Sequence, residues 1–440
     1  MKKEKIVTII VLVILFAEMI SIPSKFLYNK IIRNDTNTNN ITINWEEKYP
    51  FEQDKGKVAK LTIIQKYKNF IDKIIGMIET ATNNNVLMHD ELVYLYGSFN
   101  KNIGMKIVKD IESTNVFLES GQFNYLYPPR ENLTQTIQDV IDLKKYVEEK
   151  NMNFMYVQTP LKLFAEKDII PGCIDNYIYK DKARLREELK KKNVDAFDVA
   201  TYLSGEYNEY MEYFYDTDHH WKIETGLKVA ALLAEELNQK YNFEIDVGIY
   251  DIENYNIKTY KNGFLGSSGK KVTLGYTEAE NFNLITPKQI QNWHVTIPQV
   301  GIDDSGDFDL ILDEKVLKIE DLYKTNPYAA YTYGDQPYIS IKNNKDGLKG
   351  KVLVVGDSFA EVIVPFLAMG CEQVDRIDLR HFNGSLRNFL ENNHYDVVML
   401  LQSRPGENYD AESHNSGWDF RWWNVRKKLL LKNGRSFLYF

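Results

Sequence analysis

From about residue 133 onward, apolar positions alternate between two kinds of spacing. They recur every three to four residues over 134–150, 182–192 and 223–241, as in amphipathic helices. Short continuous apolar runs lie between and after these segments, at 153–160, 194–199, 351–355, 374–379 and 395–402. This alternation is typical of βαβ units, in which helices cover both faces of a parallel sheet. We therefore expect an α/β fold with a doubly wound parallel sheet, an α/β/α sandwich, in which the last three runs are neighbouring strands.

Residues 244–350 interrupt this alternation of helical and strand-like patterns. They are rich in Gly, Asn, Asp and Tyr, lack a long helical pattern and contain short alternating runs such as KKVTLGY (270–276) and PYISIK (337–342). Alternation of this kind is typical of strands, so we predict a β-rich insertion or lid. Upstream, helical spacing over 57–80 predicts a helix that leads into a globular body extending over 57–440.

The N-terminus predicts a membrane anchor. Residues 6–22 are almost entirely apolar and follow a lysine-rich start. This run is at the lower limit for a membrane span but longer than a usual signal-peptide core, and no small-residue cleavage site follows it. An uncleaved anchor within residues 1–30 is therefore favoured over a cleaved signal peptide or a buried helix. A polar, Asn- and Thr-rich spacer at 31–56 would follow it.

Composition narrows the class of protein. The 440 residues are 44% hydrophobic and 26% charged, which fits a folded chain with a sizeable core. The formal net charge of −8 opposes attraction to a phosphate backbone, so no nucleic-acid partner is expected. Two cysteines, Cys173 and Cys371, are too few for a disulfide framework or a Cys-rich zinc module.

The first candidate for chemistry is KVLVVGDSFAE (351–361). An apolar, β-branched strand leads into Gly356, Asp357 and Ser358, and an apolar helix follows. The carboxyl ends of parallel strands are where open α/β sheets bind ligands, and N–H groups at the start of a helix can stabilise an oxyanion. Ser358 is therefore a candidate nucleophile. Alternatively, Ser358 and Glu361 form a capping box, which needs no catalysis.

The second candidate is YDTDHHW (215–221), which holds two of the seven histidines. In an extended segment alternate side chains share a face, so Asp218 and His220 would touch while His219 points the other way. A carboxylate can then fix the tautomer of the imidazole and steady its positive charge, as hydrolytic triads require. Two alternatives stay open: Asp216, Asp218, His219 and His220 as metal ligands, or a structural histidine that caps the following helix.

Together these two motifs resemble a known family. GDSF resembles the nucleophile block of SGNH (GDSL-like) hydrolases, and DHHW is the namesake motif of the DHHW protein family, which is related to the alginate O-acetyltransferases of the AlgJ/AlgX type. In ordinary SGNH hydrolases the Asp and His follow the Ser, whereas in the AlgJ/AlgX type Asp-x-His comes first, as it does here. The resemblance covers about residues 85–405. It implies an SGNH-like fold with Ser358 as nucleophile and Asp218 and His220 as its partners.

The sequence departs from the SGNH pattern at the oxyanion hole. The Asn of the third SGNH block has no counterpart, and the nearest amides after the last apolar run are Gln402 and Asn408. The glycine of the second block is unassigned, although Arg380 and Asn383 follow the corresponding strand. The resulting candidates for the oxyanion hole or for substrate contacts are Gly356, Asp357, Gln402, Arg380 and Lys270.

The segment GFLGSSGKKV (263–272) suggests a phosphate-binding loop, but its spacing excludes one. Five residues rather than four separate Gly263 from Gly269, and Lys271 occupies the position of the required Ser or Thr. We predict a flexible turn before a strand, with a substrate-facing loop at the DHHW motif as the alternative.

The resemblance implies a membrane-anchored O-acetyltransferase whose SGNH-like domain lies outside the cytoplasm, at the cell surface or in the periplasm. His220 would take the Ser358 proton, an acetyl-serine would form, and a polysaccharide hydroxyl would accept the acetyl group. The resemblance also implies a multi-pass acyltransferase of the MBOAT class as the partner that supplies acetyl groups. We expect no cofactor and no metal. A carbohydrate esterase with the same triad and a non-catalytic glycan-binding surface protein are the alternatives.

Overall fold

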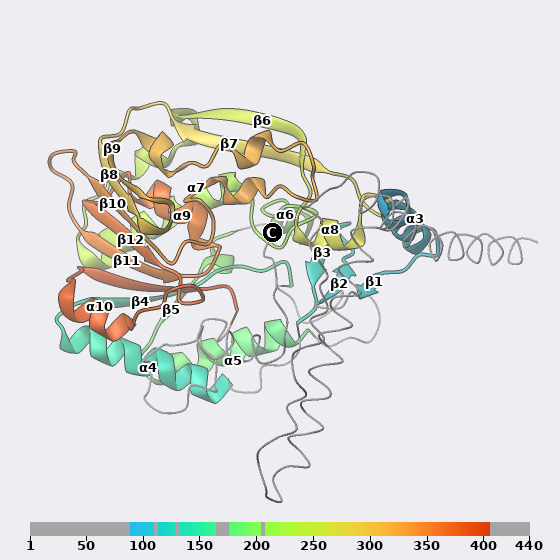
Figure 1. Cartoon of the computed structure of the whole chain (residues 1–440). Helices are drawn as coiled ribbons and strands as arrows, with labels where there is room; N and C mark the ends of the chain where they lie inside the picture. Colours follow the sequence, from blue (N-terminus) through green and yellow to red (C-terminus); the bar gives the residue numbers. More distant parts are fainter. Residues whose placement is uncertain (1–88, 110–112, 128–132, 164–175, 204–206, 405–440) are drawn as a thin grey trace, which may run out of the picture. The chain divides into compact units, whose positions relative to one another are not determined.

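An eight-stranded sheet carries most of the described structure (Figure 1). The structure is a computed structural model that describes residues 89–109, 113–127, 133–163, 176–203 and 207–404. Neighbouring strands run parallel in the order β5-β4-β13-β11-β12, and β10, β8 and β9 continue the sheet with antiparallel pairing. Their bounds are β4 Asn153–Gln158, β5 Ala196–Asp198, β8 Trp293–Ile297, β9 Ile302–Gly306, β10 Tyr338–Asn343, β11 Lys351–Gly356, β12 Gln373–Ile377 and β13 Val397–Gln402.

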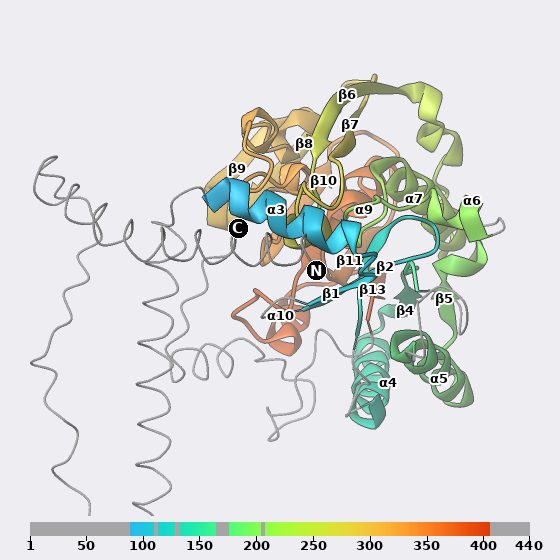
Figure 2. The same cartoon turned by 90° about the vertical axis from the view of Figure 1, so that its right-hand side faces the viewer.

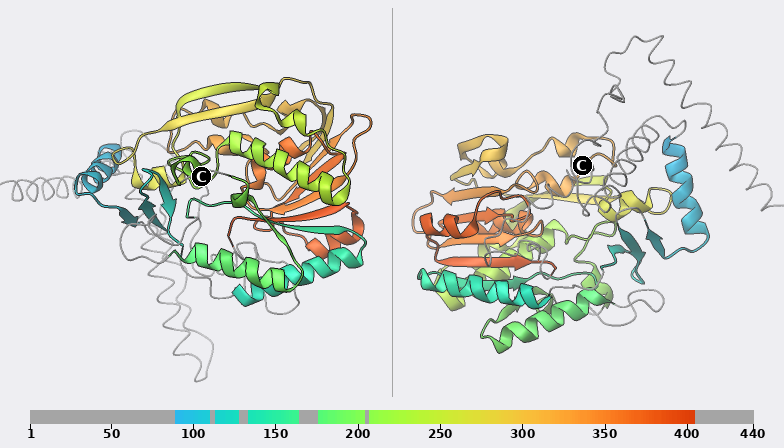
Figure 3. Two further views of the ribbon diagram at one scale, coloured as in Figure 1. Left: turned by 180° about the vertical axis from the view of Figure 1, so that it is seen from behind. Right: turned by 60° about the horizontal axis from the view of Figure 1, so that its bottom comes forward.

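Helices cover both faces of this sheet, as Figures 1 and 3 show. Helices α7 (Ile223–Tyr241) and α9 (Ala360–Leu367) pack on one face, and α4 (Leu133–Glu149), α5 (Tyr177–Lys191) and α10 (Leu386–Asn392) pack on the other. The β11 sequence explains this sandwich, because successive side chains of a strand face opposite sides. Val352 and Val354 enter the core under α7 and α9, whereas Leu353 and Val355 enter the core above α4 and α5.

Smaller elements lie beyond the ends of the main sheet. Strands β1 (Ile107–Lys109), β2 (Thr114–Phe117) and β3 (Phe123–Tyr125) form an antiparallel sheet, visible at the centre of Figure 2. Strands β6 (Tyr255–Phe264) and β7 (Glu280–Pro287) pair with each other. The remaining helices are α3 His89–Asn102, α6 Tyr207–Met211 and α8 Ser267–Val272, with 3₁₀ turns at Val199–Thr201, Val247–Tyr250, Ile252–Asn254, Pro298–Val300, Phe308–Ile311, Val316–Lys318 and Pro327–Ala330. Helix α3 begins in a separate unit that ends at Tyr96; the elements discussed below lie in the unit of residues 97–426.

The expected mixed α/β architecture is confirmed in its main features. The helix predicted over 223–241 is α7, and the last three apolar runs form the neighbouring strands β12, β11 and β13. The expectation of a wholly parallel sheet is wrong, because β8, β9 and β10 pair antiparallel. These strands lie within 244–350, so part of that β-rich segment extends the main sheet. Whether the segment acts as an insertion or lid stays a prediction.

Several predictions fall outside the described residues. They concern the anchor at 6–22, the spacer at 31–56, the helix at 57–80, and the residues Cys173 and Asn408. Cys371 is buried with a free thiol. Within the described ranges, no helix has the length and apolar character needed to cross a membrane.

Candidate active site

The DHHW motif lies in a closed loop that precedes α7. Phe214 and Trp221 form an antiparallel bridge, and inside it the Tyr215 N–H donates to the His220 carbonyl at 3.2 Å. The chain therefore bends through the motif, and the predicted extended conformation is wrong. As a result His219 does not point away from its neighbour: the His219 and His220 ring centroids are 3.9 Å apart.

The loop brings three predicted residues into one hydrogen-bonded chain. His220 Nδ1 lies 2.6 Å from Asp218 Oδ1, and His220 Nε2 lies 2.7 Å from Ser358 Oγ. Asp218 and Ser358 are 140 residues apart in the sequence, and they meet because the loop before α7 and the turn after β11 lie at the same place in the fold. Asp218 and His220 are both buried, with 4% and 9% of their surface exposed. The arrangement has the order Asp, His, Ser that a nucleophilic relay requires.

The charge on Asp218 determines the direction of each hydrogen bond. Burial alone raises the pKa of this carboxyl group. The positive charges that His219 and His220 carry when protonated, and hydrogen bonds from His220 and the Ser267 N–H, outweigh burial and hold the pKa well below its usual value. An ionised Asp218 can only accept, so His220 Nδ1 donates to it. In the neutral imidazole Nε2 is then the acceptor, and the Ser358 hydroxyl donates to it. This is the tautomer that a general base for Ser358 needs.

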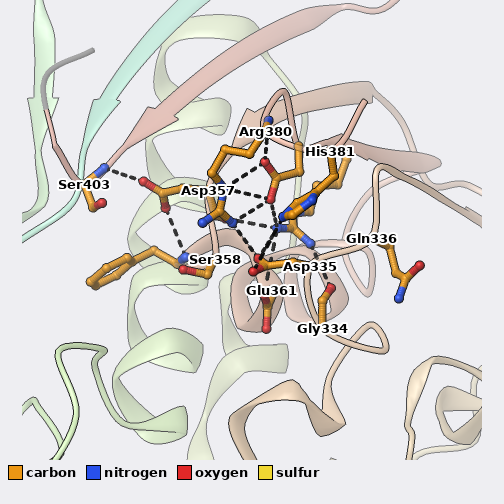
Figure 4. Close-up of polar contacts among 12 residues, drawn as sticks. Gly334, Asp335, Gln336, Asp357, Ser358, Glu361, Arg380, His381 and Ser403 are labelled. Atoms are coloured by element: carbon orange, nitrogen blue, oxygen red, sulfur yellow. Dashed lines mark hydrogen bonds and ion pairs between the residues drawn. The ribbon is translucent and has the colours of Figure 1, made fainter. Parts of the chain in front are cut away.

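Ser358 lies in the turn between β11 and α9, where the sequence predicts it. Asp357 secures this turn, because its carboxylate accepts from the Phe359 N–H at 3.0 Å and from the Ser403 N–H at 2.8 Å (Figure 4). The predicted capping box does not form: α9 has Phe359 at its N-cap without a side-chain cap, and the Ser358 hydroxyl faces His220. Gly356 lies close to α9, because a Cβ atom there would be 3.0 Å from the Ala360 Cβ.

The segment 263–272 supports Asp218, a role that the sequence did not reveal. It forms the end of β6 and then α8, so the predicted turn before a strand is wrong. The Ser267 N–H, at the start of α8, donates to Asp218 Oδ2 at 2.6 Å. Gly266 allows this approach, because a Cβ atom there would lie 2.3 Å from the Asp218 Cβ. In the sequence, the glycines of GSSG (266–269) were the feature that could have indicated this close approach to Asp218.

A half-buried carboxylate supports the loop from the other side. Glu280, at the start of β7, accepts from the Asp216 and Thr217 N–H groups, both at 2.8 Å, and from the Thr217 hydroxyl at 2.6 Å. The Thr217 hydroxyl in turn accepts from the Gly266 N–H at 2.8 Å. Glu280 was not predicted, since nothing in its local sequence distinguishes it from a surface residue.

Aromatic rings enclose the imidazole of His220. Tyr328 stacks on it, and Phe359 lies against it with ring centroids 5.0 Å apart. The neighbouring His219 contacts Ser267 Oγ at 3.2 Å, and its ring centroid is 5.4 Å from that of Tyr125. Burial, with the charge of His220, lowers the pKa of His219 well below its usual value, so His219 is neutral at ordinary pH.

This loop holds part of the ligand set that the alternative of a metal site would need. Asp218, His219 and His220 each offer an atom, and these atoms lie within 4.8 Å of one another. However, both ring nitrogens of His220 are engaged, with Asp218 and with Ser358. A tetrahedral metal site would have to break the relay and recruit further ligands. The expected absence of a metal stays a prediction.

The side chains proposed for the oxyanion hole or for substrate contacts make no hydrogen bond to the side chains of Asp218, His220 or Ser358. Lys270 Nζ donates to the Thr325 carbonyl at 2.6 Å, and burial lowers its pKa. Gln402 accepts at Oε1 from the Tyr156 hydroxyl at 3.3 Å, within the core on the α4 and α5 side of the sheet. Arg380 contacts Asp378 and Asp335. Among the described residues, no side-chain amide is hydrogen-bonded to Ser358.

Part of the chain matches a family of known proteins. Residues 120–263 match the family described as the SGNH hydrolase-like domain of acetyltransferase AlgX. The predicted resemblance to SGNH-like proteins of the AlgX type is confirmed. The matched span includes Asp218 and His220 and ends before Ser358. Among curated proteins, none matches the sequence at a significant level.

Three solved structures are similar to this chain to different degrees. PatB1 of Bacillus cereus, solved with a sulfonyl adduct, is 21% identical with a TM-score of 0.54, and the match covers 72% of this chain and 99% of that chain. A DHHW family protein from Eubacterium siraeum is 17% identical with a TM-score of 0.48, over 68% of this chain and 93% of that chain. The O-acetyltransferase domain of Pseudomonas putida AlgJ is 13% identical with a TM-score of 0.42, over 73% and 99% of the two chains. The likeness to PatB1 shows a common fold.

Proposed function

We propose that this protein transfers an acetyl group to a hydroxyl of a cell-surface or extracellular polysaccharide through an acetyl-Ser358 intermediate. The observation that carries the proposal is the unbroken chain of hydrogen bonds from Asp218 through His220 to Ser358. The match to an acetyltransferase AlgX domain favours acyl transfer among the reactions that such a relay can perform. The sulfonyl adduct reported for PatB1 adds support, since sulfonyl reagents modify activated serines.

The geometry supports a specific role for each residue in the first half of the reaction. His220 Nε2 takes the Ser358 proton as Oγ bonds to the acetyl carbon, and a tetrahedral oxyanion forms. The protonated imidazole is steadied by Asp218, whose second oxygen is held by the Ser267 N–H. When the bond to the donor breaks, His220 gives its proton to the leaving group, and acetyl-Ser358 remains.

The second half repeats these steps with a sugar hydroxyl. The hydroxyl oxygen attacks the acetyl carbon while its proton passes to His220, the bond to Ser358 Oγ breaks, and His220 returns the proton to Oγ. Water in place of the sugar would make the protein an esterase. The two reactions differ only in the molecule that attacks the acyl-enzyme.

The products therefore test the proposal. The full chain is incubated with 4-nitrophenyl acetate and with chemically deacetylated alginate or cell-wall glycan, and acetate esters on the glycan are measured against free acetate. We expect ester on a glycan, and none with Ser358→Ala. Free acetate alone would identify an esterase, and binding of glycan with no turnover would identify a glycan-binding protein.

The proposal includes a location outside the cytoplasm and a supply of acetyl groups. Residues 6–22 would anchor the chain, and a multi-pass acyltransferase of the MBOAT class would deliver acetyl groups across the membrane. These parts rest on the N-terminal sequence pattern and on the resemblance. Alkaline phosphatase fused after Phe440 tests the location, because that reporter needs disulfides that form outside the cytoplasm. An inactive fusion with correct expression would contradict it.

A further inference from the structure

Arg376 is a fully buried charge inside the main sheet, on the strand where parallel pairing with β11 changes to antiparallel pairing with β10. It occupies β12 with 0% of its surface exposed, between apolar neighbours on β11 and β10. Its side chain shares a face with Val374, which packs under α7 and α9. Burying a guanidinium is costly unless its hydrogen bonds are replaced. The hydrogen-bond partners of Arg376 therefore indicate the role of its buried side chain.

One of those contacts reaches the turn that carries Ser358. Arg376 Nη2 donates to the Asp357 carbonyl and to Asp378 Oδ2, both at 3.2 Å, and Nη1 donates to the Gly334 carbonyl at 3.3 Å. Figure 4 shows the surrounding polar groups, with Asp335 and Glu361 on one side of the Asp357–Ser358 turn and Ser403 on the other.

Acidic groups on three elements keep Arg376 in this position. Asp378 follows β12 and is itself fully buried, and the Asp335 carboxylate is 3.7 Å from Arg376 Nη2. Glu361, on α9, lies 4.0 Å away. Burial, together with the charge of Asp335, raises the pKa of Glu361 well above its usual value, so the charge partners of Arg376 are the two aspartates.

The Asp357 carbonyl and the Ser358 N–H belong to one planar peptide group, in which they point in opposite directions. The carbonyl accepts from Arg376 and also from the Ala360 N–H at 3.0 Å, so two donors fix its direction. Fixing the carbonyl also fixes the N–H. Among the described residues, no hydrogen-bond acceptor takes up the Ser358 N–H, which leaves it available to a ligand beside Ser358 Oγ.

We propose that Arg376 is a positioning residue that aims the Ser358 N–H at the oxyanion of the tetrahedral intermediate. It does so from behind the peptide group, by holding the Asp357 carbonyl. The inference rests on the proposed acyl transfer at Ser358. Its guanidinium also polarises the peptide group, which strengthens the N–H as a donor. This role matters more here than in an ordinary SGNH site, because the sequence has no counterpart of the SGNH block III Asn.

The test compares Arg376→Met and Arg376→Lys with Val374→Ala. Val374 is buried on the same strand and face but does not contact the Asp357–Ser358 peptide, so it controls for a weakened core. Turnover of 4-nitrophenyl acetate by the full chain gives kcat and KM, and thermal unfolding gives the stability of each variant. Loss of one oxyanion donor lowers kcat about 100- to 1000-fold, so we expect kcat to fall about 100-fold in Arg376→Met. We expect a fall of about 10-fold in Arg376→Lys, because lysine keeps the positive charge but lacks the paired N–H donors of the guanidinium.

The proposal requires that KM and the pH midpoint of kcat/KM stay unchanged in the arginine variants, because His220 is untouched, and that Val374→Ala keeps its kcat. Equal losses of kcat in Val374→Ala and Arg376→Met at equal stability would reduce Arg376 to a structural residue. Wild-type kcat in both arginine variants would also overturn the proposal. If Arg376→Met does not fold, Asp378→Asn takes its place in the test. This substitution removes the charge of one partner of Arg376 and keeps the shape of the Asp378 side chain. An unchanged kcat in Asp378→Asn would count against the proposal. A wild-type chain that does not acylate Ser358 would overturn the proposed function itself.

Discussion

Tyr328 stacks on His220, with ring centroids 4.3 Å apart and an angle of 17° between the ring planes. Tyr328 is buried and follows Pro327, in a 3₁₀ turn remote in sequence from the DHHW motif. The stack restricts rotation of the imidazole about the line that joins Asp218 to Ser358. Tyr328 therefore belongs to the surroundings that hold the proposed base in its working orientation.

Removing this ring should slow the reaction without abolishing it. An aromatic pair contributes about 0.5–1.5 kcal/mol beyond its buried area, so Tyr328→Ala should lower kcat about 2- to 10-fold. Tyr328→Phe keeps the ring and should keep kcat close to the wild-type value. The measurement is steady-state turnover of 4-nitrophenyl acetate by both variants. Equal kcat values in the Ala and Phe variants would show that stacking does not orient His220.

A single backbone donor can be removed from Asp218 by Ser267→Pro. Proline is tolerated at the first position of a helix, and Gly266, with φ −69° and ψ 176°, already has the extended conformation that precedes proline. The substitution deletes the N–H that donates to Asp218 Oδ2. Because hydrogen bonds to charged groups are worth about 1.5–3 kcal/mol, we expect kcat to fall about 10-fold or more.

The matched control for this change is Ser267→Ala. It keeps the N–H and removes only the hydroxyl that contacts His219. We expect its kcat to stay close to the wild-type value. A loss as large as that of the proline variant would mean that the His219 contact, and not the bond to Asp218, supports the site.

The two halves of the relay differ in how far sequence could identify them. Ser358 was predictable once the apolar strand that runs into Gly-Asp-Ser was combined with the Asp-x-His motif, because the strand and turn alone also fit a capping box. The pairing of Asp218 with His220 was predicted from an extended conformation, whereas a loop closed by the Phe214–Trp221 bridge produces it. A single residue between the partners is compatible with either geometry, so local spacing could not distinguish them.

The supporting residues could not be predicted, because their contacts span long stretches of chain. Ser267 is 49 residues from Asp218, and Glu280 is 63 residues from Thr217. Arg376 did carry a signal, as a cation inside the apolar run 374–379. The antiparallel pairing of β10 with β12 was missed because parallel and antiparallel strands have similar short apolar patterns.

A buried lysine near the site predicts a pH-dependent stability. Lys182, on α5, donates to the Ser403 carbonyl at 3.2 Å and to the Thr159 carbonyl, and burial lowers its pKa to about 7 from an ordinary 10.5. Above about pH 7 the unfolded chain therefore binds a proton that the folded chain has released. The free energy of unfolding should rise with pH between these two values, by at most about 1.4 kcal/mol per pH unit.

Lys182→Met removes this dependence, and Lys190→Met, exposed on the same helix, should not. The measurement is urea unfolding at pH 6.5, 7.5 and 8.5. We expect the stability of the wild-type chain relative to Lys182→Met to increase with pH. A constant difference would show that Lys182 keeps an ordinary pKa in the folded state.

Metal removal should leave the activity unchanged. Asp218, His219 and His220 are the nearest candidate ligands, but His220 already uses both nitrogens in the relay. We expect turnover to survive dialysis against EDTA and elemental analysis to find no stoichiometric transition metal. One zinc ion per chain, lost together with activity, would reassign the DHHW loop as a metal site.

The central claim is that Ser358 carries the acetyl group, and mass spectrometry of the acyl-enzyme tests it most directly. The full chain is mixed with 4-nitrophenyl acetate, quenched in acid and digested with trypsin, which releases Ser358 in the peptide of residues 352–376. We predict that this peptide gains the mass of one acetyl group, that fragmentation places the group on Ser358, and that His220→Ala reduces the yield sharply. An unmodified peptide from a chain that turns over the ester, or the same acetylation in the His220 variant, would contradict the account.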